Sequence, residues 1–213
     1  MWMAQSTSFL LRIHNFFMAH HTYRTDGIVL SGMDAGEGSR YLGLLTEELG
    51  FIEAHCASVR EMRSRMRFHT QPYTLATFGL VRGKEVWRLT NALEIQSAAA
   101  FRDTPNGRGA VARVSTLVRR LLHGEEPNRA LFSAMRNMLL YLADPTISEK
   151  EARRVECITL LRSLSSLGYL GESDSFAHFI AEPLFNPQLL AAFAEQEREA
   201  VVAINRSLKE TQL

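Results

Sequence analysis

The first half of the chain is a series of short apolar runs in which apolar and polar residues alternate. Such alternation is typical of half-buried β-strands, and turn residues separate the runs. The first run is expected to end at Ser31-Gly32, and Arg82-Gly83-Lys84 forms a tight hairpin turn before the last. Residues 40–49 fit a helix or a strand, but the turns at Gly38 and Gly50 on either side favour a strand. The expected strands cover residues 27–30, 40–49, 51–57, 74–81 and 85–94.

Beyond Phe101 the spacing of apolar residues changes to the 3.6-residue period of amphipathic helices. A cluster of helix-breaking residues at 103–107 separates the two textures. Ser148 and Glu151 have the spacing of a capping box, which predicts a helix start. The expected helices cover residues 111–122, 128–143, 148–167 and 187–208.

These patterns predict an α+β chain of two domains. Five short strands over residues 22–101 fit an OB-fold β-barrel, a fold that often binds nucleic acid. Residues 102–213 form an all-α domain. Residues 1–21 are expected to be a disordered leader, with Met18 as the simplest start, although residues 9–17 also fit a short amphipathic helix.

Charge changes this picture only locally. The chain has 24 Lys and Arg against 23 Asp and Glu, so anion binding requires clustered cations. Such a cluster lies between the third and fourth strands, and its alternating members would share one face if extended. A DNA-binding loop and a merely solvated loop both fit it. The cluster consists of Arg60, Arg63, Arg65 and Arg67, and weaker DNA-binding candidates are Arg40, Arg82 and Lys84.

Aromatic side chains near this cluster could stack on nucleobases. Phe68 directly follows Arg67 and is the best candidate for stacking, although burial in the core fits it equally well. Trp87 lies within an apolar strand and is expected in the core.

Catalytic and metal-binding patterns are weak, so we expect no enzyme activity, no metal and no cofactor. The glycines near residue 36 lack the lysine of a phosphate-binding loop, and neither G-x-S-x-G nor H-E-x-x-H occurs. Cys56 and Cys157 are expected to be free thiols. His55 and Cys56 are neighbours on a strand, so they point to opposite faces. No apolar run reaches the roughly 18 residues of a membrane span, which indicates a soluble protein.

Several of these segments together resemble the RecO family of bacterial recombination mediators. The C-terminal half adds a segment similar to the family's F-E-L-x-L-L-x-x-L-G-Y. The resemblance runs from about residue 22 to the end. It rests on Thr25-Asp26-Gly27-Ile28-Val29-Leu30, residues 44–50, Gln71-Pro72-Tyr73, Glu85-Val86-Trp87-Arg88-Leu89-Thr90, and residues 155–169.

The resemblance implies a function in RecF-pathway DNA repair. Such a protein binds single- and double-stranded DNA, anneals strands coated with single-strand-binding protein, and helps RecR to load RecA, which it contacts indirectly. The resemblance also implies a cytoplasmic, nucleoid-associated protein that does not bind a membrane. Many members carry a four-cysteine zinc module after the L-G-Y motif, whereas residues 170–182 contain no cysteine. The chain therefore resembles a short member lacking that module.

The resemblance also implies that the helical half binds the acidic, apolar C-terminal tail of single-strand-binding protein. Arg113, Arg119 and Arg120 lie beside an apolar stripe that suits such a tail. An ordinary amphipathic helix fits the same residues. The near-neutral net charge keeps a second function open, a non-enzymatic protein-interaction module whose barrel no longer binds DNA.

Overall fold

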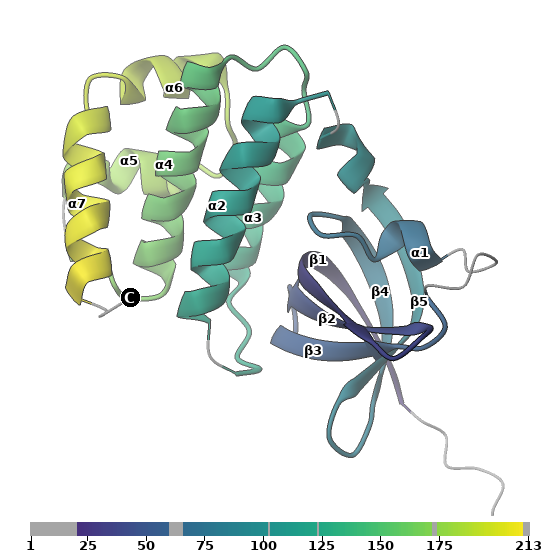
Figure 1. The fold of residues 1–213 in the computed structure, drawn as a ribbon. Helices are drawn as coiled ribbons and strands as arrows, with labels where there is room; N and C mark the ends of the chain where they lie inside the picture. Colours follow the sequence, from purple (N-terminus) through teal and green to yellow (C-terminus); the bar gives the residue numbers. More distant parts are fainter. Residues whose placement is uncertain (1–20, 60–65, 102, 123, 172–173, 211–213) are drawn as a thin grey trace, which may run out of the picture.

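The structure is a computed structural model that describes residues 21–59, 66–101, 103–122, 124–171 and 174–210. It consists of a β-barrel followed by a layer of helices that packs against one side of the barrel (Figure 1). The predicted α+β fold with an N-terminal OB-type barrel is therefore confirmed. Nearly all of the predicted leader lies outside the described residues.

The barrel is closed in the order β1-β2-β3-β5-β4. All neighbouring strands are antiparallel except β3 and β5, which pair in parallel over a short stretch. A short helix, α1 (Met66–His69), follows β3 and contacts β5. The strands are β1 (Thr22–Ala35), β2 (Ser39–Thr46), β3 (Gly50–Cys56), β4 (Leu75–Arg82) and β5 (Trp87–Gln96).

Strand β1 is longer than its sequence pattern predicts. The expected end at Ser31-Gly32 is wrong, because the register shifts between Val29 and Ser31 and pairing with β2 then continues to Ala35. A bulge of this kind bends a strand without ending it. The small polar residues at this point therefore mark a bend in the barrel wall.

The helical half differs from the prediction near its end. The capping box at Ser148 and Glu151 is confirmed, but the single helix expected over 187–208 is two helices, separated by a turn at 194–196. No glycine or proline marks this turn; Phe193 before it and Ile204 after it are both buried in the core. The helices are α2 (Pro105–Leu121), α3 (Arg129–Leu142), α4 (Glu149–Ser166), α5 (Ala177–Ala181), α6 (Pro187–Phe193) and α7 (Glu197–Glu210), with short 3-10 turns at η2 (Ala98–Phe101) and η3 (Asp174–Phe176).

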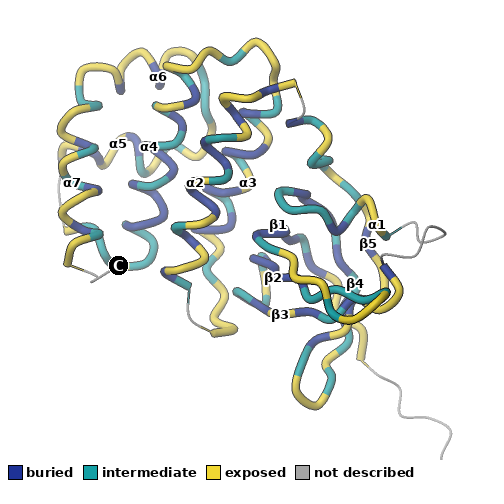
Figure 2. Tube along the Cα trace, in the orientation of Figure 1, coloured by how far each residue is buried: buried dark blue, intermediate teal, exposed yellow. Residues whose placement is uncertain are grey.

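The hydrophobic core of the helices continues into the wall of the barrel. Ile28, Leu45 and Leu75 belong to the same cluster of buried side chains as Phe101 and the inner faces of α2, α3 and α4. A separate cluster around Phe78 fills the barrel interior. Figure 2 shows the buried positions along the inner sides of the helices and of the strands that face them. The barrel and the helices are thus joined by a shared apolar core.

Polar contacts reinforce this junction at the loop between α2 and α3. Glu125 accepts a hydrogen bond from Trp87 Nε1 at 3.1 Å and forms an ion pair with Arg82. Gly50, at the start of β3, lies against the backbone of Glu126, where a Cβ atom would approach its carbonyl oxygen to 2.4 Å. The loop therefore holds the helical layer against the end of the barrel.

Arg162 on α4 fixes the segment that follows α5. Its guanidinium is buried and donates to the carbonyl oxygens of Phe179 at 2.9 Å and Pro183 at 3.2 Å, and also to that of Glu182. The same group lies 4.5 Å from the ring centroid of Phe185. Burial lowers the pKa of Arg162 to about 10, so the side chain stays charged at neutral pH.

Among the described residues, the structure contains no helix with both the length and the apolar character needed to cross a membrane.

Candidate nucleic-acid interface

A row of side chains crosses the outer surface of three barrel strands. Tyr41 on β2 pairs with His55 on β3, and His55 pairs with Arg88 on β5. Ile52, Ala54 and Cys56 point into the barrel, so His55 points outward. The rings of Tyr41 and His55 lie 5.1 Å apart between centroids. We call Tyr41, His55 and Arg88 the outer row.

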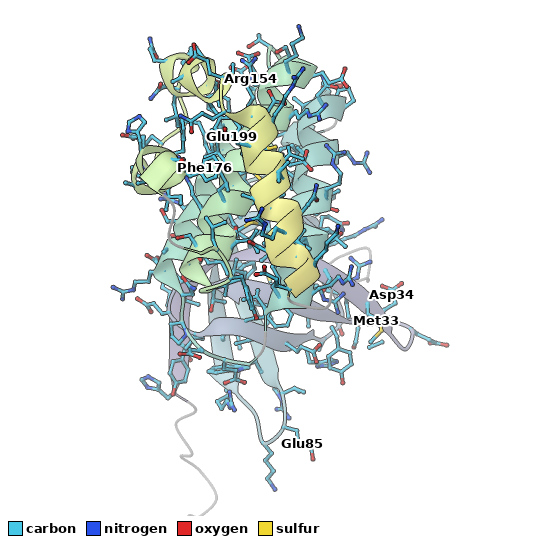
Figure 3. The ribbon with its side chains drawn as sticks, turned by 90° about the vertical axis from the view of Figure 1, so that its left-hand side faces the viewer. Met33, Asp34, Glu85, Arg154, Phe176 and Glu199 are labelled. Carbon is cyan, nitrogen blue, oxygen red and sulfur yellow. The ribbon has the colours of Figure 1, made fainter. Side chains whose placement is uncertain are left out.

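A groove of about 380 Å³ begins beside the outer row. Tyr41 and Glu53 line it from β2 and β3, Met33 from the end of β1 and Val86 from the β4–β5 hairpin, and Arg119 reaches it from α2. OB barrels commonly bind oligonucleotides on this face, between the loop after the first strand and the loop before the fifth. Figure 3 shows Met33 projecting from the side of the barrel and Glu85 at the tip of the β4–β5 hairpin.

Flat rings and cations on this face suit a nucleic acid strand. Bases stack on aromatic rings, and guanidinium groups contact phosphates without reading the sequence. Tyr41 and His55 are half-buried, whereas Arg88 is exposed. The outer row can therefore hold a base and an adjoining phosphate at neighbouring positions.

Two predicted DNA-binding arginines of the barrel already have partners in the protein. Arg40 Nε lies 3.0 Å from Asp34 Oδ1, and its side chain is 22% exposed. Arg82 pairs with Glu125, and its guanidinium lies 4.8 Å from the ring centroid of Trp87. A phosphate would have to compete with these carboxylates. Lys84 is exposed in the hairpin between β4 and β5.

The basic cluster lies mostly outside the described residues. Arg60, Arg63 and Arg65 belong to that part, so their prediction is untested, whereas Arg67 is exposed on α1. Phe68 is 69% exposed and not buried in the core, while Trp87 is 4% exposed and is a core residue as expected.

The three predicted partner-binding arginines do not form one surface. Arg113 makes two hydrogen bonds of 2.7 Å with Glu156 on α4, which raise its pKa. Arg120 follows two turns further along α2, on nearly the same side and exposed to solvent. Arg119 instead lines the groove beside the barrel. The sequence could not show that Arg119 faces a different surface from Arg113, because this depends on how α2 packs against the barrel; the partner-binding role of the three arginines stays a prediction.

The two thiols are poorly suited to nucleophilic chemistry. Burial raises the pKa of Cys56 and of Cys157 to about 11, so neither forms a thiolate at neutral pH. His55 and Cys56 lie on opposite faces of β3. Within the described ranges, no group of three or more His, Cys, Asp or Glu side chains could hold a metal ion.

The outer row was not predicted as a site from the sequence. The alternation in β3 does place His55 on the outward face. It cannot show that Arg88, 33 residues later, becomes its neighbour, because the parallel pairing of β3 and β5 depends on closure of the barrel.

Comparisons with known proteins match both parts of the chain. The model of the family "Recombination protein O N terminal" matches residues 18–98, which include the whole barrel. A protein of Pelotomaculum thermopropionicum named DNA repair protein RecO is 32% identical over 166 residues, or 76% of this chain and 63% of that protein. This alignment extends beyond the barrel into the helices.

Two further proteins with the same name show similar agreement. The one from Heliobacterium modesticaldum is 33% identical over 150 residues, which are 70% of this chain and 53% of that protein. The one from Thermobifida fusca is 30% identical over 158 residues, which are 73% and 64% respectively. The chain thus spans about half to two thirds of the length of the curated relatives it matches.

Proposed function

Because the chain belongs to the RecO family, we propose that it is a DNA repair protein that binds DNA on the outer face of its barrel. The observation that carries this proposal is the outer row, where the Tyr41 and His55 rings lie 5.1 Å apart beside the exposed Arg88. The relatives are named as DNA repair proteins, which supports DNA as the nucleic acid.

The basic cluster extends this surface in the proposal. Arg40, at the start of β2, pairs with Cys56 at the end of β3. The chain leaves β3 at the same end as Arg40, and Arg63, Arg65 and Arg67 follow β3 in the sequence. Several cations along one path suit the regular spacing of phosphates, which a single cation does not.

The proposed activity requires no covalent chemistry. The protein would bind single- and double-stranded DNA, bring complementary strands together, and act with RecR to help load RecA. Its free energy would come from phosphate contacts, base stacking and partner binding.

The proposed site for the tail of single-strand-binding protein is a groove of about 480 Å³ between α2, α4 and α7. Arg113 and Arg153 supply cations for an acidic tail, and Leu160 and Val201 supply apolar surface. Glu156 already neutralises part of this charge, so the groove suits a tail that carries apolar as well as acidic side chains.

Fluorescence anisotropy of a labelled single-stranded oligonucleotide, titrated at low and moderate salt, tests DNA binding. We expect binding that weakens with salt, with a log–log slope on the order of −2 to −4 for three or four phosphate contacts. Changing Arg63, Arg65 and Arg67 together to alanine should weaken binding and flatten this slope.

The matched control replaces three exposed arginines of the helical part, Arg136, Arg198 and Arg206, with alanine. This control removes the same charge away from the barrel and should change binding little. Absence of binding by the unmodified protein at low salt would leave the interaction module as the function. If both triple variants lose DNA affinity equally, the basic cluster contributes only through the net charge of the protein and not through specific phosphate contacts.

A further inference from the structure

A third groove, of about 500 Å³, lies where α1 and the turn at 70–73 meet the connection from β5 to α2. None of the outer-row residues lines it, nor do Arg113, Arg119 and Arg120. Its lining includes Phe68, Gln71, Tyr73, Ala99, Phe101 and Arg108.

The floor of this groove is held in place by the core. Phe101 is 2% exposed and belongs to the apolar core shared by the barrel and the helices, and Tyr73 packs against that core. The backbone N–H of Tyr73 donates to the carbonyl oxygen of Val29 at 2.7 Å. The position of the groove is therefore fixed relative to β1.

The wall formed by α1 is also anchored. His69 Nδ1 lies 3.0 Å from Glu94 Oε2 on β5, and Gln71 Nε2 donates to the carbonyl oxygen of Arg67 at 2.9 Å. The His69–Glu94 contact holds the short helix against the barrel, and the Gln71 bond ties the following turn to the helix. The contact with His69 also engages Glu94, a nearby carboxylate, and so reduces its repulsion of an anion.

Phe68 is the exposed side chain of this wall. It is 69% exposed, although it lies between the anchored residues Arg67 and His69. Arg67 is exposed beside it, and the exposed Arg108 lines the groove from the first turn of α2. An accessible ring with one exposed cation next to it in sequence and another lining the same groove matches the chemistry of one nucleobase and its adjoining phosphates.

We propose that this groove holds one unpaired base of a single-stranded nucleic acid, stacked on Phe68, while Arg67 and Arg108 contact the phosphates on either side. The inference rests on the proposed function and adds a preference for single strands to it. In a duplex both faces of each base are covered by neighbouring bases, so an isolated ring cannot stack on them without separating the pair.

The test compares single-stranded and duplex DNA by anisotropy, using Phe68→Ala, Phe68→Trp and Arg108→Ala. Because Phe68 is largely exposed, its removal should leave the fold intact, which a thermal unfolding curve checks. We expect Phe68→Ala to weaken binding of the single strand on the order of 10-fold and binding of the duplex by less than about 2-fold. Phe68→Trp should restore single-strand binding.

Matched controls are Leu184→Ala, which removes an apolar side chain that is 60% exposed, and Arg136→Ala, which removes an exposed cation of α3. An oligonucleotide containing 2-aminopurine, whose fluorescence falls on stacking, gives a second readout. Its fluorescence should fall on binding to the unmodified protein and fall less with Phe68→Ala.

The failures of the two proposals are distinguishable. No binding of either DNA by the unmodified protein contradicts the proposed function itself. Binding of the single strand that Phe68→Ala leaves unchanged, or weakens equally for single strand and duplex, overturns the stacking site alone. If Phe68→Ala instead weakens binding of an acidic peptide and leaves oligonucleotide binding unchanged, the groove is a peptide site.

Discussion

At the scale of single residues, Arg162 carries a buried charge in the helical half that must be satisfied by hydrogen bonds. Its buried charge is accepted only because three backbone carbonyl groups and the ring of Phe185 surround it. Replacement by methionine keeps much of the volume but leaves those carbonyl groups without their donor. We expect Arg162→Met to lower the free energy of unfolding by about 2 to 4 kcal/mol, measured by urea denaturation.

Arg153→Met is the matched control for this substitution. The side chain of Arg153 is 67% exposed and makes an ion pair of 3.3 Å with Glu197. Exposed pairs contribute little, so the expected change is within about 1 kcal/mol. Similar losses for the two variants would show that the buried guanidinium does not anchor the segment.

The two buried thiols predict a loss of stability in alkaline solution. The pKa of Cys56 rises from 9.0 to about 11 in the folded protein, and that of Cys157 does the same. Between these values the unfolded thiol has lost its proton and the folded thiol has kept it, so stability falls as the pH rises from 9 to 11.

Urea denaturation at several pH values checks this dependence. Cys56→Ala should show a shallower decline than the unmodified protein, by about 2 kcal/mol at pH 11. Other groups that titrate in this range, including Arg162, are common to both proteins and cancel in the comparison. Parallel declines would mean that Cys56 ionises as readily in the folded state as in the unfolded state.

Individual side chains were predictable where local spacing decides their position. The alternation of β3 predicted that His55 and Cys56 lie on opposite faces, and the apolar surroundings of Trp87 predicted its burial. Arg82 shows the limit of this approach. Its position in a hairpin predicts a solvated cation, but Arg82 instead forms an ion pair with Glu125, 43 residues later. Sequence spacing cannot show a contact that depends on how the helices dock.

At the scale of elements, the junction between β3 and the α2–α3 loop depends on a glycine. Gly50 has φ of +71°, and a Cβ atom there would overlap the backbone of Glu126. Gly36 has a similar φ of +64° but open space around its Cα. Comparing substitutions at these two glycines therefore separates the cost of backbone strain, which both would show, from the cost of a steric clash, which only Gly50 would show.

We expect Gly36→Ala to cost about 1 kcal/mol through strain alone, and Gly50→Ala to cost about 2 to 4 kcal/mol, because the loop must also move. Chemical denaturation of the two variants gives the comparison. Equal costs would show that the loop yields freely and does not clamp the barrel.

The kind of each long element could be predicted, while several of their ends could not. Ser148 and Glu151 signalled the start of α4 because a capping box is a local hydrogen-bonding device. The bulge after Val29 and the turn between α6 and α7 are set by curvature and by packing in the core. Neither has a distinctive residue pattern of its own.

At the scale of the whole molecule, the shared core couples the barrel to the helices. Ile28, Leu45 and Leu75 from the barrel are buried with helical residues, so separating the two parts would expose apolar surface on both. We expect a single cooperative transition in differential scanning calorimetry, with the calorimetric enthalpy equal to the van't Hoff enthalpy. Two resolved transitions would show that the parts unfold independently.

This shared core also limits how the family's parts can be exchanged. A chimera that joins this barrel to the helices of a relative would inherit two surfaces shaped by different histories of substitution. Side chains on both sides of the seam around Leu45 and Phe101 would have to be transplanted together, as would the glycine that meets the loop. The secondary structure changes at the boundary between barrel and helices, but the two parts cannot be exchanged independently at this boundary.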